Sequence, residues 1–585
     1  MDDLQQQERA KEDQALKEKF LLSISKLVNT DQQPKEVDFV EEVSNLHALL
    51  IASNYRQIRD IAGQLDLGRL FDLFNNSPVF AAGTPVPGQV ELLDVMSMLL
   101  EALNGGEVLV KYYDHVVDGL DGALRPLQIV DLWLKKLVRP VFSSEGQLKV
   151  VVNSSVNING LLRSTVRLLA AEDTGVAAAA HDISVVAAKA FRQNFFSPVL
   201  IEELRKLKDY KGSYSADQAS QKRLKNLKTV DRETVQIRLY EVVVDVSTAS
   251  QLQLDMMKAN GLLPELVADF EAKLSVDPLV ALNMLKLMTD LASTPHTIAY
   301  LRTSTSVLQS VAKRLELKKE GRGEGEENIW DALILPGCIN FFIRLAEFDL
   351  SVLEDSKYGD LLEARLLAML SPPNSSSTES LVLAVDSVAY LCRKNAGKRF
   401  VGEQKPTLAT AALDRIAAII TGVGATELKA RALSALASML ELTDDSDPGS
   451  KAAQLTERWY QRVDQAGAGL PKLMAILAEP LPELRLPALN LLRVLATTAW
   501  GQQALVTGAQ GGPTAFLDYL LDRRTETTAE GREAKYAVVR ELVMSPFVRL
   551  SFPPEALLRL RAYYKAGAFA READEEVSVA FGSAS

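Results

Sequence analysis

The hydrophobic residues of this chain recur at the spacing of α-helices. Leu, Ala and Met follow one another at intervals of three and four residues in segments such as Pro278–Met288, Leu428–Leu440 and Leu484–Leu495. No segment shows the alternation of apolar and polar residues, enriched in β-branched types, that a half-buried strand requires. The pattern therefore predicts an all-α protein.

These apolar segments also repeat along the chain. Equivalent positions fall at steps of 43, 60, 43, 48, 56 and 49 residues. The aligned positions are Leu239, Leu282, Phe342, Val385, Leu433, Leu489 and Val538. A period of about 40 to 50 residues is typical of the two- or three-helix unit of HEAT and armadillo proteins. The sequence therefore predicts a right-handed α-solenoid of HEAT/armadillo-like helical repeats, whose inner helices form one extended binding surface.

Further helices are predicted upstream of the aligned positions. Leu161–Ala171 and Val176–Phe191 form a helix pair, and Val90–Leu103 and Leu124–Leu137 extend the pattern toward the N-terminus. Downstream, Pro264 and Pro471 follow a glycine by a few residues and fit the first turn of a helix, where the backbone N–H has no intrahelical acceptor. About ten repeats of this length would fill the chain.

Polar segments divide the chain into one solenoid and two tails. We expect a polar N-terminal tail over residues 1–19, an armadillo/HEAT-like solenoid over 20–567 and a solvated C-terminal tail over 568–585. Insertions are expected near 208–228, 318–328 and 444–451, and the second and third of them account for the longer repeat steps. The first of them belongs to the Lys-rich stretch 206–228, which we interpret as a solvated loop or a loosely packed helix.

Charge and cysteine content limit the classes of partner and the cellular compartment that we expect. The formal net charge is -11 and the pI is about 5.2, which disfavours a nucleic-acid partner. The two cysteines, Cys338 and Cys392, form no CxxC pair, so we expect a reducing compartment. This compartment is the cytoplasm, and the nucleus is a possible second location. The polar start of the chain does not resemble a secretory signal, and no apolar run is long enough to span a membrane. We expect a monomer when the chain is free.

The residues that support catalysis or metal binding are scarce and scattered. Four histidines, His47, His115, His181 and His296, occur singly without metal-ligand spacing. The glycine-rich stretch Gly321–Glu326 carries acids where phosphates would lie, and no phosphate-binding or nucleophile-elbow motif occurs. The sequence therefore predicts a protein that is not an enzyme and that needs no cofactor or metal.

Several segments resemble one protein family. They are Val235–Thr248, Leu335–Phe342, Leu455–Trp459, Pro480–Asn490, Phe516–Arg523, Ala534–Leu542 and Leu558–Tyr563. Their order and spacing from about residue 230 to 565 resemble the 26S proteasome non-ATPase regulatory subunit 5 family. The first 230 residues match this family only in outline.

The resemblance implies a chaperone for assembly of the base of the 26S proteasome regulatory particle. Such a chaperone binds the C-terminal domain of an AAA ATPase subunit, regulatory subunit 7, and possible further partners are other base subunits during assembly. It hinders premature docking of the ATPases on the core particle and is absent from the mature complex.

The alternative is a general armadillo-type scaffold or transport adaptor. Importin-type adaptors carry Trp-x-x-x-Asn ladders, and none of the four tryptophans here has Asn at that spacing.

The partner-binding residues are predicted from the repeat pattern. Polar side chains that interrupt the apolar stripe of the inner helices should point toward a bound partner. These candidates are Asn283, Lys286, Asn340, Arg344, Arg431, Asn490, Arg493, Lys535 and Arg540.

Overall fold

A computed structural model describes most of the chain. The described residues are 14–15, 18–24, 26, 36–63, 67–76, 87–120, 127–209, 230–274, 276–316, 326–354, 356–371, 378–443, 449–479, 481–508 and 512–570. They form two compact units, Met1–Thr297 and Ile298–Ser585. The predicted insertions lie largely outside the described residues, as do residues 1–13 of the expected N-terminal tail and 571–585 of the C-terminal tail.

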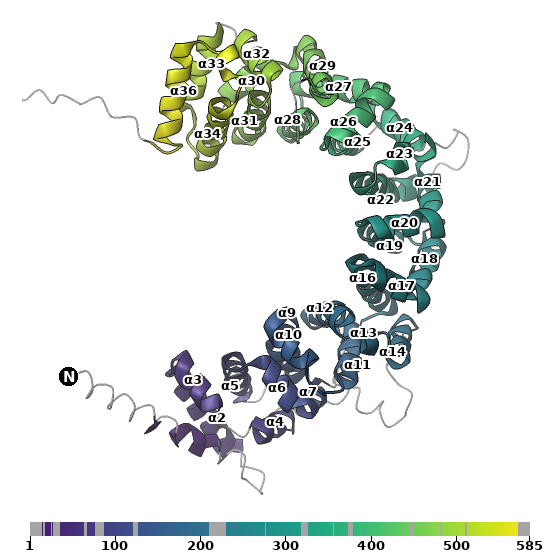
Figure 1. The fold of residues 1–585 in the computed structure, drawn as a ribbon, viewed down its shortest axis with the longest axis vertical. Coiled ribbons are helices and arrows are strands. Elements are labelled where there is room, and N and C mark those ends of the chain that lie inside the picture. The colour runs from purple at the N-terminus through teal and green to yellow at the C-terminus, as the bar shows by residue number, and fades with distance from the viewer. Residues whose placement is uncertain are drawn as a thin grey trace, which may run out of the picture. The chain divides into compact units, whose positions relative to one another are not determined.

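The first unit is built of helices (Figure 1). They are α2 (Glu36–Ile51), α3 (Tyr55–Ala62), α4 (Leu67–Asn76), α5 (Gln89–Ala102), α6 (Gly105–Lys111), α7 (Tyr113–Leu120), α8 (Leu127–Leu132), η2 (Trp133–Val138), α9 (Arg139–Ser143), α10 (Glu145–Val152), α11 (Asn159–Arg167), η3 (Leu168–Ala170), α12 (Thr174–Ala190), α13 (Arg192–Phe195), α14 (Pro198–Lys208), α16 (Arg232–Ala249), α17 (Gln251–Ala259), α18 (Leu262–Lys273) and α19 (Pro278–Leu291). Three of the upstream helices predicted from the sequence correspond to α5, to α11 with η3, and to α12, with ends that shift by one or two residues. The fourth, Leu124–Leu137, corresponds to α8 and η2, and its residues 124–126 lie outside the described residues.

The second unit is helical as well, and the boundary between the two units falls within α20 (Pro295–Ser304). Its further elements are α21 (Val307–Leu315), α22 (Glu326–Phe348), α23 (Ser351–Glu354), α24 (Ser356–Leu370), α25 (Thr378–Leu391), α26 (Asn395–Arg399), η5 (Phe400–Gln404), α27 (Pro406–Thr421), α28 (Thr426–Leu440), α29 (Lys451–Val463), η6 (Asp464–Ala468), α30 (Leu470–Ala478), α31 (Pro482–Ala496), α32 (Ala499–Thr507), α33 (Gly512–Leu521), η7 (Arg523–Thr525), α34 (Ala529–Met544), α35 (Val548–Ser551) and α36 (Pro554–Ala566).

One row of equivalent helices runs through each unit. In the second unit α22 packs on α25, α25 on α28, α28 on α31 and α31 on α34, and Figure 1 shows these helices side by side in chain order. In the first unit α12 packs on α16 and α16 on α19. We call these helices row A of their unit. Because each repeat contributes one helix to the row and packs on the repeats before and after it, the predicted all-α solenoid is confirmed.

The core lies where the sequence repeat places it. The seven aligned apolar positions fall one on each successive row A helix from α16 to α34. Six of them are buried, and Leu282 on α19 is half-buried. Pro264 and Pro471 lie in the first turns of α18 and α30, as predicted. That one continuous solenoid spans 20–567 stays a prediction, because the chain divides into two compact units.

The described part of the chain contains no helix both long and apolar enough to cross a lipid bilayer. The longest helix among the described residues, α22, has 23 residues, and its sequence includes the charged residues Asp331, Arg344 and Glu347.

Candidate partner-binding surface

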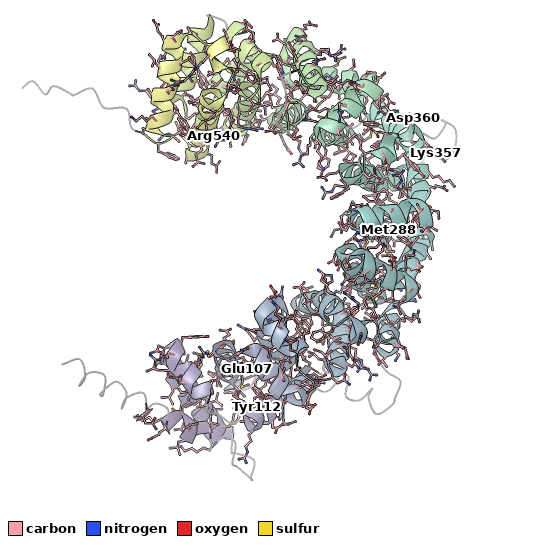
Figure 2. All side chains as sticks on the ribbon, viewed as in Figure 1. Glu107, Tyr112, Met288, Lys357, Asp360 and Arg540 are labelled. Atoms are coloured by element: carbon pink, nitrogen blue, oxygen red, sulfur yellow. The ribbon has the colours of Figure 1, made fainter. Side chains whose placement is uncertain are left out.

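Eight of the nine predicted contact residues lie at the surface of row A helices. Asn283 and Lys286 on α19 are exposed, as are Asn340 and Arg344 on α22. Arg431 on α28, Asn490 on α31 and Arg540 on α34 are exposed, and Arg493 on α31 is half-buried. Figure 2 shows the Arg540 side chain on the row A side of the second unit. The structure therefore brings six candidates onto row A of the second unit, and two lie on row A of the first.

Lys535 on α34 differs from the other candidates, and its expected surface position is wrong. Its side chain is buried, with 1% of its surface exposed. The Lys535 ammonium donates a hydrogen bond to the Asp522 carbonyl oxygen at 2.6 Å and lies 4.6 Å from the centre of the Tyr519 ring. Burial lowers the pKa of Lys535 to about 8. Its spacing of three and seven residues from the buried Val538 and Leu542 places it on the core side of the helix.

Arg431 and Arg493, on row A of the second unit, form ion pairs with acidic residues of the preceding repeat. Arg431 on α28 lies 3.4 Å from the carboxylate of Asp386 on α25. Arg493 on α31 lies 2.6 Å from the carboxylate of Glu441, which follows α28. Burial raises the pKa of Asp386, although the charge of Arg431 opposes this shift. These ion pairs fix the direction of both guanidinium groups across the surface.

A cluster around Tyr390 on α25 was not predicted from the sequence. The guanidinium carbons of Arg344 and Arg393 lie 5.7 Å and 5.1 Å from the centre of its ring. The Tyr390 hydroxyl donates a hydrogen bond to Glu347, and Lys394 donates one to the Glu347 carbonyl oxygen at 2.7 Å. Both guanidinium groups lie within the range of a cation–π contact, so Tyr390 holds two cations at the junction of α22 and α25. The sequence did contain one signal for this cluster, because Tyr390 follows Asp386 by four residues and so lies on the same face of the helix.

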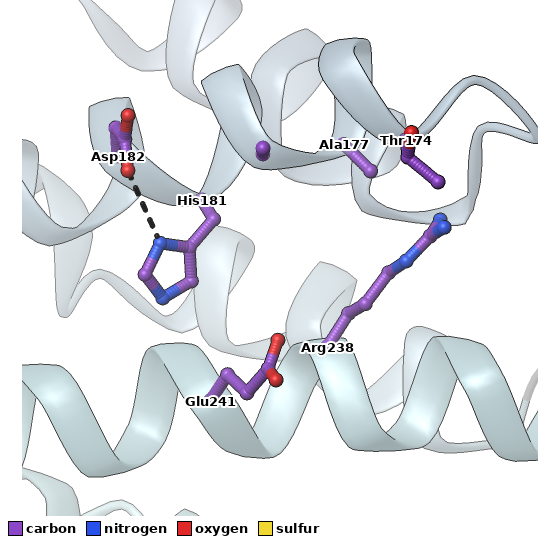
Figure 3. Close-up of a pocket in the computed structure, with 7 residues that line it drawn as sticks. Thr174, Ala177, His181, Asp182, Arg238 and Glu241 are labelled. Carbon is purple, nitrogen blue, oxygen red and sulfur yellow. Dashed lines mark hydrogen bonds and ion pairs between the residues drawn. The ribbon is translucent and has the colours of Figure 1, made fainter. Parts of the chain in front are cut away.

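Row A of the first unit carries a small pocket between α12 and α16 (Figure 3). The pocket has a volume of about 230 Å³. Its walls are Thr174, Ala177, Ala178, His181 and Asp182 from α12 and Arg238 and Glu241 from α16. The Arg238 guanidinium donates hydrogen bonds to the carbonyl oxygens of Leu169 and Ala171 at 3.0 and 2.6 Å. The polar groups of this pocket mainly connect one repeat to the next.

His181 links the two row A helices that form this pocket. Its Nε2 lies 3.1 Å from the carboxylate of Asp245 on α16, and its Nδ1 lies 3.5 Å from that of Asp182. Burial alone would lower the pKa of His181, but hydrogen bonds to the two carboxylates and their charges outweigh burial and raise it. His181 is half-buried.

This pKa shift predicts a pH dependence for the stability of the first unit. Because the folded state raises the pKa of His181, the stabilisation is full below the unfolded value of about 6.5 and is lost as the pH rises through the folded value. We expect urea unfolding of the first unit between pH 6 and 8 to show this decrease. The His181→Gln variant should lack this contribution, and an identical pH profile in that variant would contradict the assignment.

The described residues offer no arrangement for metal or thiol chemistry. No group of three or more His, Cys, Asp or Glu side chains in the described part of the chain is placed to hold a metal ion. Burial raises the pKa of the Cys392 thiol to about 12, so it carries almost no thiolate at neutral pH. Row A of the second unit carries oriented cations, amides and one aromatic ring, which can make noncovalent contacts with a partner.

Comparisons with known proteins place the chain in a family. The family model described as proteasome non-ATPase 26S subunit matches residues 23–584. The chain is 25% identical over 533 residues to the 26S proteasome non-ATPase regulatory subunit 5 of Homo sapiens, covering 91% of this chain and 94% of the relative. The protein of the same name from Drosophila melanogaster is 23% identical over 352 residues, covering 59% of this chain and 62% of the relative.

Among solved structures, the crystal structure of Kap121p has a TM-score of 0.43 at 11% identity and covers 95% of this chain and 55% of its own. A designed armadillo repeat protein in complex with a (KR)4 peptide has a TM-score of 0.33 at 17% identity and covers 48% of this chain and 99% of its own. Because the family model spans nearly the whole sequence, the chain belongs to the proteasome non-ATPase 26S subunit family, the family of regulatory subunit 5.

Proposed function

We propose that this protein is a non-catalytic chaperone for assembly of the base of the 26S proteasome regulatory particle. It binds the C-terminal domain of an AAA ATPase subunit, regulatory subunit 7, and is absent from the mature complex. The observation that carries the proposal is membership of the regulatory subunit 5 family over residues 23–584.

Row A of the second unit is the proposed contact surface. Its exposed side chains come from helices that pack on one another in order, so they are presented at a fixed repeat spacing. Arg431 and Arg493 are already oriented by their ion pairs with Asp386 and Glu441, which reduces the conformational entropy lost on binding. The remaining proposed contacts are Asn340, Arg344, Asn490 and Arg540, with Asn283 and Lys286 contributing from the first unit.

The proposal is tested by reversing charge on this surface. We expect the double variant Arg431→Glu, Arg493→Glu to bind the purified ATPase C-terminal domain at least about tenfold more weakly, because the partner would meet two anions in place of two cations. The measurement is a calorimetric titration with the full chain, accompanied by thermal unfolding to show that the fold is retained.

The matched control lies on α29, outside row A and on the other side of the second unit in Figure 1. Arg458 and Arg462 are exposed there, and Arg462 is 2.6 Å from the Asp414 carboxylate. The variant Arg458→Glu, Arg462→Glu therefore makes the same charge change and also breaks an exposed ion pair. It should bind within about twofold of the unmodified chain. Equal weakening by both variants, or weakening explained by unfolding, would reject row A as the contact surface.

Affinity purification of the protein from cell extract, with identification of the proteins that co-purify, tests the assembly role itself. A chaperone of the base should co-purify with base ATPases and without core-particle subunits. Recovery of mature 26S particles, or only of proteins unrelated to the proteasome, would contradict the proposal, and the second result would favour a general scaffold or transport adaptor.

A further inference from the structure

The size of the pocket between α12 and α16 limits the molecule that it can hold. Its volume of about 230 Å³ is room for about eight water molecules at about 30 Å³ each. Pockets for drug-sized ligands are larger, at roughly 300 to 1,000 Å³. Helix α12 lines the middle of the pocket with Ala177 and Ala178, so no large side chain of that helix fills it. The pocket therefore suits a molecule of about eight to ten non-hydrogen atoms.

Two side chains of α16 bring opposite charges into this pocket (Figure 3). Arg238 extends toward Thr174, and Glu241 extends toward His181. They are three residues apart, which corresponds to about 4.5 Å along the helix at about 1.5 Å per residue. In the part of the chain that the structure describes, no ion pair joins the two. A ligand in this pocket therefore meets a cation and an anion at separate places.

The cation of the pocket is a half-buried guanidinium without a carboxylate partner. Arg238 uses its Nη1 for the carbonyl oxygens of Leu169 and Ala171. Its Nε and Nη2 donate no hydrogen bond to any other residue that the structure describes. Burial lowers the pKa of Arg238, so the charged form is disfavoured there, although the charges of nearby acids oppose this shift. A carboxylate on the free edge of the guanidinium would supply the missing partner.

The anion of the pocket also lacks a partner, unlike the other acids beside it. The Asp182 carboxylate lies 2.7 Å from the Arg139 guanidinium, and the Asp245 carboxylate lies 3.1 Å from His181 Nε2. Glu241 is half-buried, and within the described ranges it forms no hydrogen bond or ion pair. An ammonium group beside Glu241 would supply its counter-charge.

A further acid, Asp173, precedes α12 near the Arg238 end of the pocket, but its carboxylate is already engaged. It accepts a hydrogen bond from the Val176 backbone N–H at 2.8 Å, and the Lys135 ammonium lies 3.7 Å away. The hydrogen bond from Val176 lowers the pKa of Asp173. Asp173 therefore caps the helix and does not neutralise Arg238.

We propose that this pocket binds a free α-amino acid with an apolar side chain, in its zwitterionic form. The carboxylate pairs with the free edge of Arg238 and accepts a hydrogen bond from the Thr174 hydroxyl. The ammonium pairs with Glu241, and the apolar side chain lies against Ala177 and Ala178. One small ligand thus supplies both missing counter-charges, which neither a carboxylic acid nor an amine does alone. None of these residues is a proposed contact of the ATPase, so the inference does not depend on the proposed function.

Ligand-observed NMR with the full chain tests the binding. The probe is L-leucine, and its two matched analogues are isocaproate, which lacks the ammonium group, and leucinamide, which lacks the carboxylate. We expect saturation transfer from the protein to L-leucine. Each analogue leaves one of the two charges in the pocket unpaired, so both should bind at least about tenfold more weakly than L-leucine.

Two variants locate the binding in the pocket. Ala178 is exposed on α12, so Ala178→Phe places a large side chain in the pocket without entering the core, and it should reduce L-leucine binding at least about tenfold. Ala272→Phe is the matched control, because Ala272 is exposed on α18 and does not line the pocket. It should bind as the unmodified chain does. Glu241→Gln keeps the side-chain shape and removes the charge, so it should weaken binding at least about fivefold.

The other outcomes overturn the proposal. Absence of L-leucine binding to the unmodified chain rejects it, as does equal binding to the Ala178→Phe variant. If thermal unfolding shows that Ala178→Phe disrupts the first unit, Glu241→Gln decides, and unchanged binding in that variant rejects the site. Equal binding of either analogue and L-leucine shows that one charge is sufficient and rejects a zwitterion site. These results leave the ATPase test of row A in the second unit unaffected.

Discussion

Replacing Glu526 by alanine is expected to destabilise the second unit by about 3 to 5 kcal/mol, because it leaves buried cations without a counter-charge. Glu526 is 3% exposed and its carboxylate accepts a hydrogen bond from the Arg485 Nε at 3.2 Å. Arg485 also donates to the Leu477 and Thr525 carbonyl oxygens, both at 2.6 Å, so the guanidinium cannot turn outward without losing them. The buried Lys535 lies close enough that the charge of Glu526 favours its protonated form.

The measurement is the midpoint of urea unfolding of the second unit, compared between variants whose unfolding free energy depends on urea concentration with the same slope. The control is an exposed ion pair in the same unit. Asp518 and Arg559 form an ion pair at 2.7 Å, with 62% and 47% of their side chains exposed. Solvent screens such a pair, so Asp518→Ala should cost less than about 1 kcal/mol. Glu526→Gln keeps the shape and removes only the charge, so it should fall between the two. If Glu526→Ala costs no more than Asp518→Ala, the buried network contributes little and the prediction is wrong.

The same network shows why the sequence predicted the exposure of most candidate residues but not the burial of Lys535. Row A followed from apolar periodicity, since burial of Leu433, Leu489 and Val538 depends on helical spacing that can be read locally. Asn490 and Arg540 interrupt that spacing and are exposed as expected. Lys535 interrupts the apolar stripe but lies on its buried side. Its counter-charges, Glu526 and Asp522, lie in the connection before α34, and no local pattern assigns them to it.

The pairings across repeats lay beyond the sequence for a related reason. Arg431 pairs with a residue 45 positions away and Arg493 with one 52 positions away. The repeat alignment predicts that such positions are neighbours, but the choice of partner depends on how far each helix is rotated and shifted against the next. The Tyr390 cluster and the His181 contacts depend on the same packing. The orientation of the contact residues is therefore a property of the assembled stack.

Replacing Trp133 by alanine is expected to destabilise the first unit by about 3 to 5 kcal/mol, because the removed indole fills the core between several helices. Trp133 in η2 has none of its surface exposed. Its ring lies 4.8 Å from that of Phe71 in an edge-to-face arrangement, and its Nε1 donates to the Asn75 Oδ1 at 2.8 Å. Asn75 in turn donates to the His115 carbonyl oxygen at 2.9 Å, so the indole also completes a buried polar chain from α4 to α7.

Hydrogen exchange resolved by segment is the appropriate measurement, since the chain forms two compact units and need not unfold in one step. The Trp133→Ala variant should accelerate exchange throughout the first unit and leave α25, α28 and α31 unchanged. Trp133→Phe keeps most of the apolar volume and loses the hydrogen bond to Asn75, so it should cost less. Faster exchange in both units of Trp133→Ala would mean that they unfold together, and the row A surface of the second unit would then depend on a core in the first.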